Sequence, residues 1–353
     1  MKGKITMPAE WHRQSFVQFT WPDKNTDWTE MLDEVLEVYY NMVYETARRE
    51  NVLIITSDIK NTQAQLNAHI NTETLHTINF LECPINDTWA RDHSFITCLR
   101  NGKPIYKDFM FNGWGLKYPA NHDNLINRRI HKAGILSGGE YENCLSWVLE
   151  GGSIESDGNG TLLTTSSCIM APNRNEGNIS EATEHSYEHL FYETLGFHRV
   201  LWLHHGHLDG DDTDGHIDTL ARFCDRTTIA YVQCTEKSDS HYEDLKLMEE
   251  ELKTFTTEEG KPYRLIPLPM TDPIYHDGER LPSTYANFLI INGAVLCPTY
   301  NQSANDKLAI AQLQKAFPYK EIIGIDCRAL IRQHGSLHCS TMQYPASDNN
   351  ANE

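Results

Sequence analysis

The strongest constraint on the fold is a unit that recurs along the chain. Each copy has a strand-like run, a turn signal and a second strand-like run, and a helix-like stretch follows. Three of the turns carry Asn-Gly or Asp-Gly, whose residues accept the positive φ angles of tight hairpins. We expect hairpins that begin at Ser94, Gly152, Asp218 and Asn287.

Helix-like stretches separate these hairpins. The first, from Asp27 to Arg49, has the apolar spacing of an amphipathic helix. The second, from Ser180 to Leu195, opens with a capping pattern and closes at Gly196. Further helices are expected at 242–255 and 306–317. The unit recurs about five times at roughly 55–70 residues, counting partial copies at each end, which is typical of a propeller-like or repeat array.

Motifs of competing α/β folds are missing from the sequence. No Gly-x-Gly-x-x-Gly follows a first strand and no Gly-x-x-x-x-Gly-Lys occurs, so neither a dinucleotide fold nor a phosphate loop is expected. A chain of 353 residues, 40% of them apolar, can build one large core or two ordinary ones. We expect one catalytic domain over 1–345 and a disordered tail over 346–353.

The net charge narrows the range of partners. The chain has 30 basic and 49 acidic residues, which gives −19 at pH 7, whereas nucleic acids and anionic membranes attract basic patches. The N-terminus lacks the apolar core of a secretory signal, and no run reaches the ~18 apolar residues of a spanning helix. We therefore expect a cytoplasmic protein that binds neither nucleic acid nor membrane; a homo-oligomer is left open.

One of the nine cysteines stands apart from the others. Their odd number and the lack of any Cys-x-x-Cys pair disfavour a disulfide framework and a Cys-rich zinc site. Most lie in apolar, strand-like runs, where cysteine acts as a small buried hydrophobe. Cys339 instead follows a histidine directly, in the late segment Gly335–Gln343.

Polar residues that a cysteine nucleophile would need share one place in the repeat. Each stands just before, or at the start of, the first strand of a hairpin: Asp92, Glu150, His216 with Asp218, and Asn287. His216 and Asp218 are two apart, so on a strand they would face the same side. If the repeats close into a ring, these strand starts converge on its axis and gather three carboxylates, a histidine and an asparagine in one cavity.

This set of groups suits a guanidine substrate. Carboxylates raise the pKa of a nearby thiol and would therefore hinder ordinary acyl transfer. A guanidinium substrate would remove this obstacle, because its N–H donors match the carboxylates and its positive charge lowers the pKa of the thiol. Sulfur could then attack the guanidinium carbon, while a histidine protonates the departing ammonia and afterwards activates water.

Two other classes of function stay open at this point. The stretch 204–218 is rich in histidine and aspartate, so a metal-dependent hydrolase is one alternative. It does not fit a calcium loop, since counting from Asp209 places Thr213 at position 5 and no glutamate at position 12. A binding propeller without catalysis is the other alternative, although binding alone does not require an intact set of Cys, His and carboxylates.

A known family carries these motifs in the same order. The matching segments are Met7–Trp11, Thr20–Pro22, Asp27–Trp28, Asn86–Asp92, Phe111–Gly115, Leu149–Ile154, Asp212–Asp218, Tyr285–Phe288 and Gly335–Cys339. They resemble the agmatine deiminase family, which is related to bacterial peptidylarginine deiminases, over nearly the whole chain. The resemblance implies a five-bladed, pentein-type α/β propeller of ββαβ modules with pseudo-fivefold symmetry.

The resemblance also implies roles for the matching residues. Cys339 would be the nucleophile of a covalent, thiouronium-type intermediate, and His216 would act as general acid and then as base. Asp92 and Asp218 would grip the guanidinium nitrogens, and Glu150 would bond the substrate or orient His216.

Residues beside these have smaller implied roles. Trp89 and Asn287 would be pocket residues that bind substrate. Arg91 is expected in a structural salt bridge. His338, next to the nucleophile, would point away from Cys339 on a strand and is given no catalytic role.

The implied reaction is hydrolysis of agmatine to N-carbamoylputrescine and ammonia, without a metal or an organic cofactor. The chain departs from the family pattern before the nucleophile, in the His334–His338 run, and also at Asp214 and His93. These departures concern the loops around the pocket, so deimination of peptidylarginine or of another guanidine is the alternative. A substrate tail with a carboxylate would need an arginine, for which Arg174 and Arg128 are the candidates.

Overall fold

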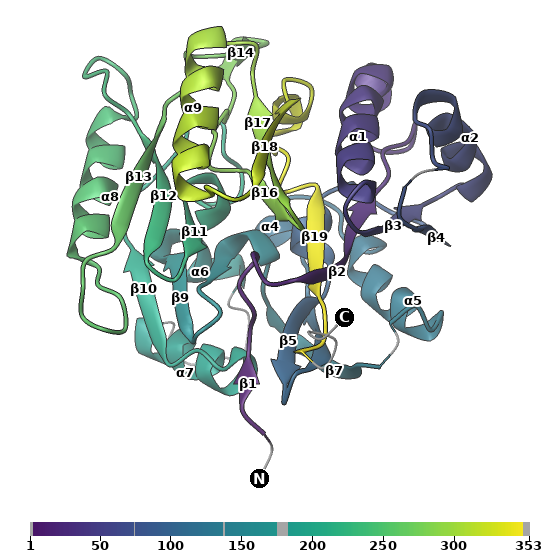
Figure 1. Cartoon of the computed structure of the whole chain (residues 1–353), viewed down its shortest axis with the longest axis horizontal. Helices are drawn as coiled ribbons and strands as arrows, with labels where there is room; N and C mark the ends of the chain where they lie inside the picture. The colour runs from purple at the N-terminus through teal and green to yellow at the C-terminus, as the bar shows by residue number, and fades with distance from the viewer. Residues whose placement is uncertain (1–2, 74, 137, 175–182, 349–353) are drawn as a thin grey trace.

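The computed structural model describes residues 3–73, 75–136, 138–174 and 183–348, which form a mixed α/β fold (Figure 1). The strands are β1 Ile5–Thr6, β2 Gln14–Thr20, β3 Asn51–Thr56, β4 Ile78–Glu82, β5 Ile96–Arg100, β6 Lys103–Met110, β7 Glu140–Val148, β8 Ile154–Ser156, β9 Thr161–Thr165, β10 Arg199–Leu203, β11 Ala221–Asp225, β12 Thr228–Gln233, β13 Arg264–Pro269, β14 Tyr275–His276, β15 Glu279–Arg280, β16 Leu289–Ile291, β17 Ala294–Thr299, β18 Glu321–Asp326 and β19 Thr341–Pro345. The α-helices are α1 Leu32–Ala47, α2 Ile59–His69, α3 Ala90–His93, α4 Gly113–Leu116, α5 Ile126–Lys132, α6 Ser166–Ile169, α7 Glu184–Leu195, α8 Tyr242–Thr254 and α9 Ser303–Ala316.

Four of the sheets share one construction. Two strands form an antiparallel pair, and a helical segment then leads to a third strand that joins the pair in parallel. This order holds for β5-β6-β7, β8-β9-β10, β11-β12-β13 and β16-β17-β18. The four predicted hairpins are therefore confirmed. Their first strands begin two or three residues later than predicted, and the polar residues of the candidate site lie in that offset or just before it.

The two ends of the chain build one further sheet. β19 pairs antiparallel with β2, β2 runs parallel to β3, and β4 completes the order. Figure 1 shows β19 and β2 side by side, although most of the sequence lies between them. The aromatic rings of Phe16 and Tyr344 stack across this pair with centroids 4.2 Å apart. The last strand thus completes the sheet that the first long strand begins.

The predicted helices form close to their expected bounds. In α7, Thr183 and Ser186 exchange side-chain and backbone hydrogen bonds as a capping box, and Gly196 ends the helix at a φ of 81°. Helix α1 buries Val35, Leu36 and Tyr39 against the strands, as its apolar spacing requires. Residues 180–182 of the predicted second helix lie outside the described residues.

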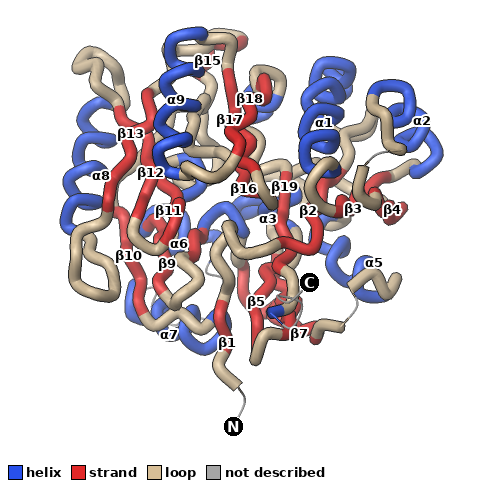
Figure 2. Tube along the Cα trace, in the orientation of Figure 1, coloured by secondary structure: helices blue, strands red, loops and turns tan. Residues whose placement is uncertain are grey.

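The longer helices lie on the outside and the strands lie within them (Figure 2). Through the described part of the chain, no helix is both long enough and apolar enough to cross a membrane. The start of the predicted tail is attached to the fold, because the N–H of Ala346 donates to Arg13 O at 2.8 Å and that of Asp348 to Gly102 O at 3.0 Å. Residues 349–353 of the predicted tail lie outside the described residues.

Candidate active site

The polar residues that were predicted to converge do lie together. Most of them stand in loops or short helical turns that lead into the first strand of a hairpin, and one stands in the turn before β19. They are Asp92 in α3, Glu150, His216, Asp218, Asn287 and Cys339. All six are buried, with at most 6% of each residue exposed.

His216 is held between two carboxylates. Its Nε2 lies 2.7 Å from Glu150 Oε2, and its Nδ1 lies 3.8 Å from Asp92 Oδ1 without a hydrogen-bond partner among the described residues. Burial alone would lower the pKa of His216, but the charge of Asp92, the neighbouring Cys168 and the hydrogen bond to Glu150 raise it well above its ordinary value. These contacts favour the imidazolium form of the ring, in which Nδ1 carries an N–H directed toward Asp92.

Glu150 is fixed in turn by an arginine. The Arg174 Nε donates to both carboxylate oxygens of Glu150, at 3.0 and 2.9 Å. Burial opposes ionisation of Glu150, but the hydrogen bond from His216 and the charge of Arg174 outweigh it and lower the pKa. With its oxygens engaged in this way, Glu150 is placed to orient His216 rather than to bind a ligand.

Asp92 accepts two hydrogen bonds and faces the histidine. Trp114 Nε1 donates to its Oδ2 at 3.0 Å, and the backbone N–H of Gly152 donates to its Oδ1 at 2.9 Å. Burial raises the pKa of Asp92 to about 6, although the nearby His216 cation acts in the opposite direction. Its carboxyl group therefore titrates close to physiological pH.

Cys339 lies between an amide and a carboxylate. Asn287 Nδ2 donates to the sulfur at 3.3 Å, and the sulfur lies 3.8 Å from Asp218 Oδ2. Burial, together with the charges of Asp218 and Asp92, raises the pKa of Cys339 well above its ordinary value. These effects favour the thiol form of Cys339 in the free site.

Asp218 is ionised and partly free. Burial disfavours its charge, but the hydrogen bond from His338 Nδ1, at 2.7 Å to Oδ2, outweighs burial and lowers the pKa of the carboxyl. Its other oxygen, Oδ1, is buried and has no hydrogen-bond partner among the described residues. A buried carboxylate oxygen without a donor is an unsatisfied acceptor for a ligand.

Two predicted strand positions are wrong. Residues 217–219 form a 3-10 turn, because Thr213 Oγ1 accepts the N–H of His216 and Thr219 Oγ1 donates to His216 O. Cys339 likewise lies in a turn before β19, where Ser340 Oγ donates to Ser336 O. His338 was predicted to point away from Cys339 on a strand; in the turn, its ring is instead hydrogen-bonded to Asp218, which lies beside the sulfur of Cys339.

A pocket leads from the surface to this cluster. It contains about 500 Å³ of space, part of it open to solvent, and Cys339, Asp92, Trp89 and Trp114 form its buried end. His216, Asp218, Glu150 and Asn287 do not line it and pack around that end. Trp89 is fixed there by a hydrogen bond from its Nε1 to Asp87 Oδ2 at 3.0 Å.

The outer part of the pocket is acidic. Its lining includes the exposed Asp27 and the half-buried Asp87, Asp211 and Asp212. Burial raises the pKa of Asp87 to about 7, and the neighbouring Asp27 carboxylate adds to this effect. Among the residues that the structure describes, no lysine or arginine lines this pocket.

Neither arginine predicted for a substrate tail reaches the pocket. Arg174 forms ion pairs with Glu150 and Asp214 and donates a hydrogen bond to the carbonyl of Thr213. Arg128 lies by Asp108, with its Nε 3.6 Å from Oδ2. Arg91 lies in the salt bridge expected of it, with its NH2 4.0 Å from Glu10 Oε2, and its NH1 donates to Gln343 Oε1 at 2.7 Å.

The histidine-rich stretch 204–218 does not assemble into one centre. His204 lies by Ser166 and Glu184, and His205 lies by Asp244. Within the described ranges, the potential metal ligands that lie close together are Glu150, Cys168 and His216, inside the site itself. Arg174 already neutralises that glutamate, which makes this group a poor place for a further cation.

Sequence reasoning missed three contributors to the site. Trp114 lies within the matched segment Phe111–Gly115, where it was not singled out, and it donates to Asp92. Arg174 was considered for a tail and instead holds Glu150. His338 was set aside on the strand argument, which the turn removes.

Comparisons with known proteins agree with this chemistry. The sequence model of the Porphyromonas-type peptidyl-arginine deiminase family matches residues 6–345. A candidate agmatine deiminase from Legionella pneumophila (strain Paris) is 30% identical over 344 residues, which are 97% of this chain and 95% of that protein.

Solved structures of deiminases are also similar to this chain over nearly their whole length. The structure of a candidate arginine deiminase from Porphyromonas gingivalis has a TM-score of 0.90 at 50% identity and covers 97% of this chain and 98% of that one. The C. jejuni agmatine deiminase, solved as a cysteine-to-serine variant with substrate bound, has a TM-score of 0.87 at 36% identity, with 97% of each chain covered.

Proposed function

This chain belongs to the Porphyromonas-type peptidyl-arginine deiminase family and is a hydrolase of guanidino C–N bonds, and on that premise we propose that its substrate is agmatine. The products would be N-carbamoylputrescine and ammonia. The acidic outer pocket, without a described lysine or arginine in its lining, is the observation that carries the choice of substrate.

The guanidinium is placed between Asp92 and Asp218. Both carboxylates lie near Cys339, and Asp218 Oδ1 is buried without a donor. Each carboxylate can accept N–H bonds from the planar guanidinium, and the cation offsets the like charges of the two groups. The same positive charge lowers the pKa of the Cys339 thiol, so the nucleophile is activated by the substrate that it attacks.

In the first half of the reaction, the bound cation drives the proton of the Cys339 thiol to solvent water, and the thiolate sulfur attacks the guanidinium carbon to form a tetrahedral adduct. The C–N bond to one terminal nitrogen then breaks, and that nitrogen leaves as ammonia with a proton from His216 Nδ1. A cationic S-alkylthiouronium remains on the sulfur. The raised pKa of His216 supports this order, because the ring is already protonated when the leaving group needs a proton.

In the second half, neutral His216 takes a proton from water, and the resulting hydroxide adds to the thiouronium carbon. The C–S bond breaks, the hydroxyl proton of the adduct passes to the departing sulfur, the neutral ureido product leaves and Cys339 is regenerated as its thiol. Glu150 keeps the ring of His216 in place through both halves. Its hydrogen bond at 2.7 Å, itself braced by Arg174, supports this positioning role.

The tail of the substrate distinguishes agmatine from its rivals. Agmatine ends in an ammonium, whereas free arginine carries a carboxylate beside its amine and a peptidylarginine carries neutral backbone. Carboxylates at the mouth favour the ammonium and repel a carboxylate. Asp87 is the best placed to bind it, because burial and Asp27 hold its pKa at about 7 and a nearby cation would favour its ionised form.

At the level of the fold, the recurring sheets support a five-bladed α/β propeller of ββαβ modules, with residues 1–345 as a single catalytic domain. The sheet that joins β19 to β2 is the feature expected where the first and last modules meet. The segments that carry the site residues then lie around the axis of the propeller.

The experiment that tests this function compares two substrates on two proteins. Ammonia release is measured with agmatine and with n-butylguanidine, which lacks the amine, for the wild type and for Asp87→Asn. We expect the variant to raise KM for agmatine by about tenfold, the cost of a charge-assisted contact, and to leave KM for n-butylguanidine within about twofold. Equal effects of Asp87→Asn on the two substrates would show that Asp87 does not bind the amine. Faster ammonia release from arginyl peptides than from agmatine would overturn the assignment of agmatine as the substrate.

A further inference from the structure

A chain of buried polar groups runs from Cys339 away from the pocket. Asp218 Oδ2 lies 2.7 Å from His338 Nδ1, and His338 Nε2 lies 2.7 Å from Glu10 Oε2. These three side chains are at most 5% exposed. Glu10 is distant from the others in sequence and lies in the matched segment Met7–Trp11, to which the reaction above gives no task.

The far end of this chain is firmly anchored. Glu10 Oε2 accepts from Arg222 NH2 at 2.6 Å, and its Oε1 accepts the N–H of Ile290 at 2.6 Å. Arg222 is fully buried and is held on its other side by Glu155, through an Nε contact of 2.7 Å. Burial opposes the charge of Glu10, but Arg222 and His338 outweigh it and lower its pKa.

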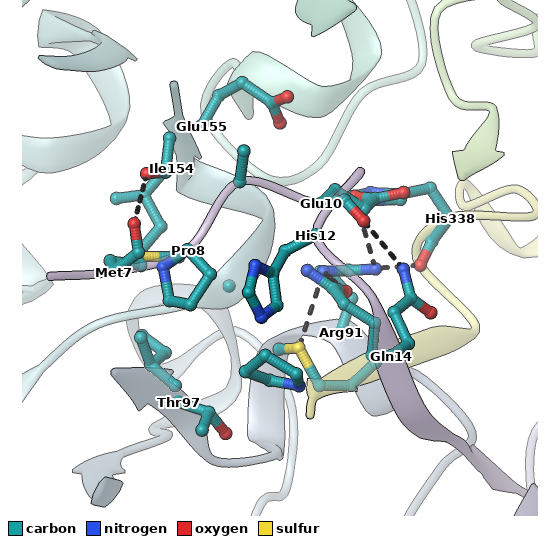
Figure 3. A pocket seen from close by; sticks show the side chains of 17 residues that line it. Met7, Pro8, Glu10, His12, Gln14, Arg91, Thr97, Ile154, Glu155 and His338 are labelled. Atoms are coloured by element: carbon teal, nitrogen blue, oxygen red, sulfur yellow. Dashed lines mark hydrogen bonds and ion pairs between the residues drawn. The ribbon is translucent and has the colours of Figure 1, made fainter. Parts of the chain in front are cut away.

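A second cavity lies at this far end, apart from the substrate pocket. Figure 3 shows Glu10, Gln14, Arg91 and His338 grouped on one side of it and Thr97 across from them. Three buried polar atoms of its lining have no hydrogen-bond partner among the described residues: Gln14 Oε1, Arg91 NH2 and Thr97 Oγ1. The cavity contains about 560 Å³ of space, part of it open to solvent, which is similar to the substrate pocket, and those atoms would bind water molecules in it.

The proton on the ring of His338 can be placed from its partners. Glu10 already has donors in Arg222 and Ile290, whereas His338 is the one N–H donor that the described residues offer to the carboxylate of Asp218. Burial and the Arg222 and Arg91 cations lower the pKa of His338, and Glu10 and Asp218 act in the other direction. In either charge state of the ring, Nδ1 keeps its hydrogen and donates it to Asp218.

The proposed grip on the guanidinium depends on which oxygen of Asp218 is free. His338 engages Oδ2, and Oδ1 is left without a donor. Without the imidazole, the carboxylate could rotate about its last bond, and both oxygens would compete for the same N–H groups of a ligand. Holding one oxygen therefore fixes the plane of the carboxylate that a planar, bidentate donor must match.

We infer that His338 is a positioning residue that orients Asp218 for the guanidinium, and that Glu10 is the anchor that orients His338. This inference rests on the proposed function, since it assigns residues to the same site. It gives the second cavity a place in the reaction as a hydrated support for Glu10 and His338, not as a site for substrate.

Two variants at one position separate the two contacts of the ring. An asparagine at position 338 places an amide nitrogen near the position of Nδ1 and can still donate to Asp218. A glutamine reaches further, places its amide nitrogen near Nε2 and can donate to Glu10. His338→Asn therefore keeps the contact that we infer to matter, and His338→Gln keeps the other one.

The readout is the cation preference of Cys339. It is the rate of alkylation by 2-chloroacetamidine, a small cation, divided by the rate with neutral 2-chloroacetamide, each corrected by the rate with glutathione. Both reagents form an S–C bond and release chloride and the thiol proton, so their difference reports the carboxylates around the sulfur. A loss of general stability would not change this ratio selectively.

We expect His338→Gln to lower the cation preference by about tenfold to a hundredfold, and His338→Asn to stay within about threefold of the wild type. Glu10→Gln should lower the preference in the wild-type background and should have no further effect in the His338→Asn background, because that variant has already broken the link. The double variant also supplies a result if His338→Gln does not fold.

Equal losses in His338→Asn and His338→Gln, or a full additional effect of Glu10→Gln in the double variant, would overturn the inference. Failure of the proposed function has a different signature, because it would show as a wild type that releases no ammonia from agmatine. The alkylation ratios would then still rank the variants.

Discussion

Cys339 is surrounded by groups that keep its proton in place. Burial and two nearby aspartates raise the pKa of the thiol, although Asn287 donates a hydrogen bond to the sulfur. In the proposed mechanism, Cys339 stays inert toward neutral electrophiles and reacts when a cation lies between the carboxylates. Activation by the substrate would therefore also protect the residue from unwanted chemistry.

The first prediction follows from that environment. In the wild type, 2-chloroacetamidine should alkylate Cys339 at least about a hundredfold faster than 2-chloroacetamide, after correction for their rates with glutathione, since two charge-assisted contacts favour the cation. Mass spectrometry of the labelled protein identifies the site. Cys339→Ser should lose both the fast labelling and ammonia release, because it removes the sulfur that is proposed to react in both. A ratio near one would contradict the thiol environment described above.

A second prediction concerns pH. Burial raises the pKa of Asp92 to about 6, so the carboxylate that should grip the guanidinium is protonated below that value and ionised above it. Binding of the cation therefore strengthens as pH rises through about 6, and kcat/KM for n-butylguanidine should fall about tenfold per pH unit below it. This substrate isolates Asp92, because it has no amine for Asp87.

Trp114→Phe provides the matched test of that assignment. The indole N–H donates to Asp92 and lowers the pKa of its carboxyl, so its removal should shift the acid limb to higher pH by roughly 0.5–1 unit. An acid limb that stays in place in this variant would mean that another group controls it.

At the scale of elements, the short turns before the hairpins position the reactive groups. Gly152 lies in one of them and donates its N–H to Asp92 Oδ1. A Cβ at this position would lie 2.5 Å from His216 Nδ1 and 2.9 Å from Asp92 Oδ1. The turn therefore passes too close to two functional side chains to tolerate any side chain of its own.

A third prediction uses this close approach. Gly152→Ala should lower kcat/KM by about a hundredfold, because the methyl group displaces His216 or Asp92, and should cost about 1–3 kcal/mol of unfolding free energy. Gly134→Ala is the control: its Cβ meets nothing within 4 Å and its φ of +69° imposes only backbone strain. We expect that control to lose about 1 kcal/mol and to keep its kcat/KM.

The sequence predicted elements well where local chemistry decides them. The hairpins that contain Asn-Gly or Asp-Gly were predicted correctly, because these pairs fix a turn over four residues. The C-terminal end of α7 was predicted correctly because Gly196 ends the helix. The errors fall where threonine and serine side chains hold the backbone in turns, at 217–219 and before β19. There a strand pattern and a turn have the same polar and apolar alternation.

The sequence could predict that the site residues converge, but it could not predict which hydrogen bonds and ion pairs hold them in place. Repeat register brought Asp92, Glu150, His216 and Asn287 to one place without coordinates. The contact between His338 and Glu10 joins residues 328 positions apart, and no local pattern reports it. Likewise, Arg174 was visible as a cation but not as the partner of Glu150, since the choice between a pocket and a core depends on tertiary packing.

At the scale of the whole molecule, the site exists only when the ends of the chain meet. Cys339 directly precedes β19, and β19 is held in the fold by its pairing with β2. The other side chains of the site come from the segments that precede four separate hairpins. Loss of the β2–β19 pair would therefore move the nucleophile while leaving Asp92 and His216 near their places, so activity should report the closure of the chain directly.

The fourth prediction tests this dependence at Tyr344, which is fully buried in β19, stacks on Phe16 and donates to Gln18 Oε1 at 2.8 Å. Tyr344→Ala should lower the free energy of unfolding by about 3–5 kcal/mol, as for other large aromatic truncations. Tyr319→Ala removes the same atoms from a side chain that is 99% exposed and should change it by less than about 0.5 kcal/mol. In urea, ammonia release and the native tryptophan fluorescence signal of the wild type should disappear over the same range of urea concentration, because the site belongs to one cooperatively folded unit. If Tyr344→Ala instead lost activity at a urea concentration where its fluorescence still reported folded protein, the closing pair would be a locally unfolding element, and the remaining sheets would be stable without it.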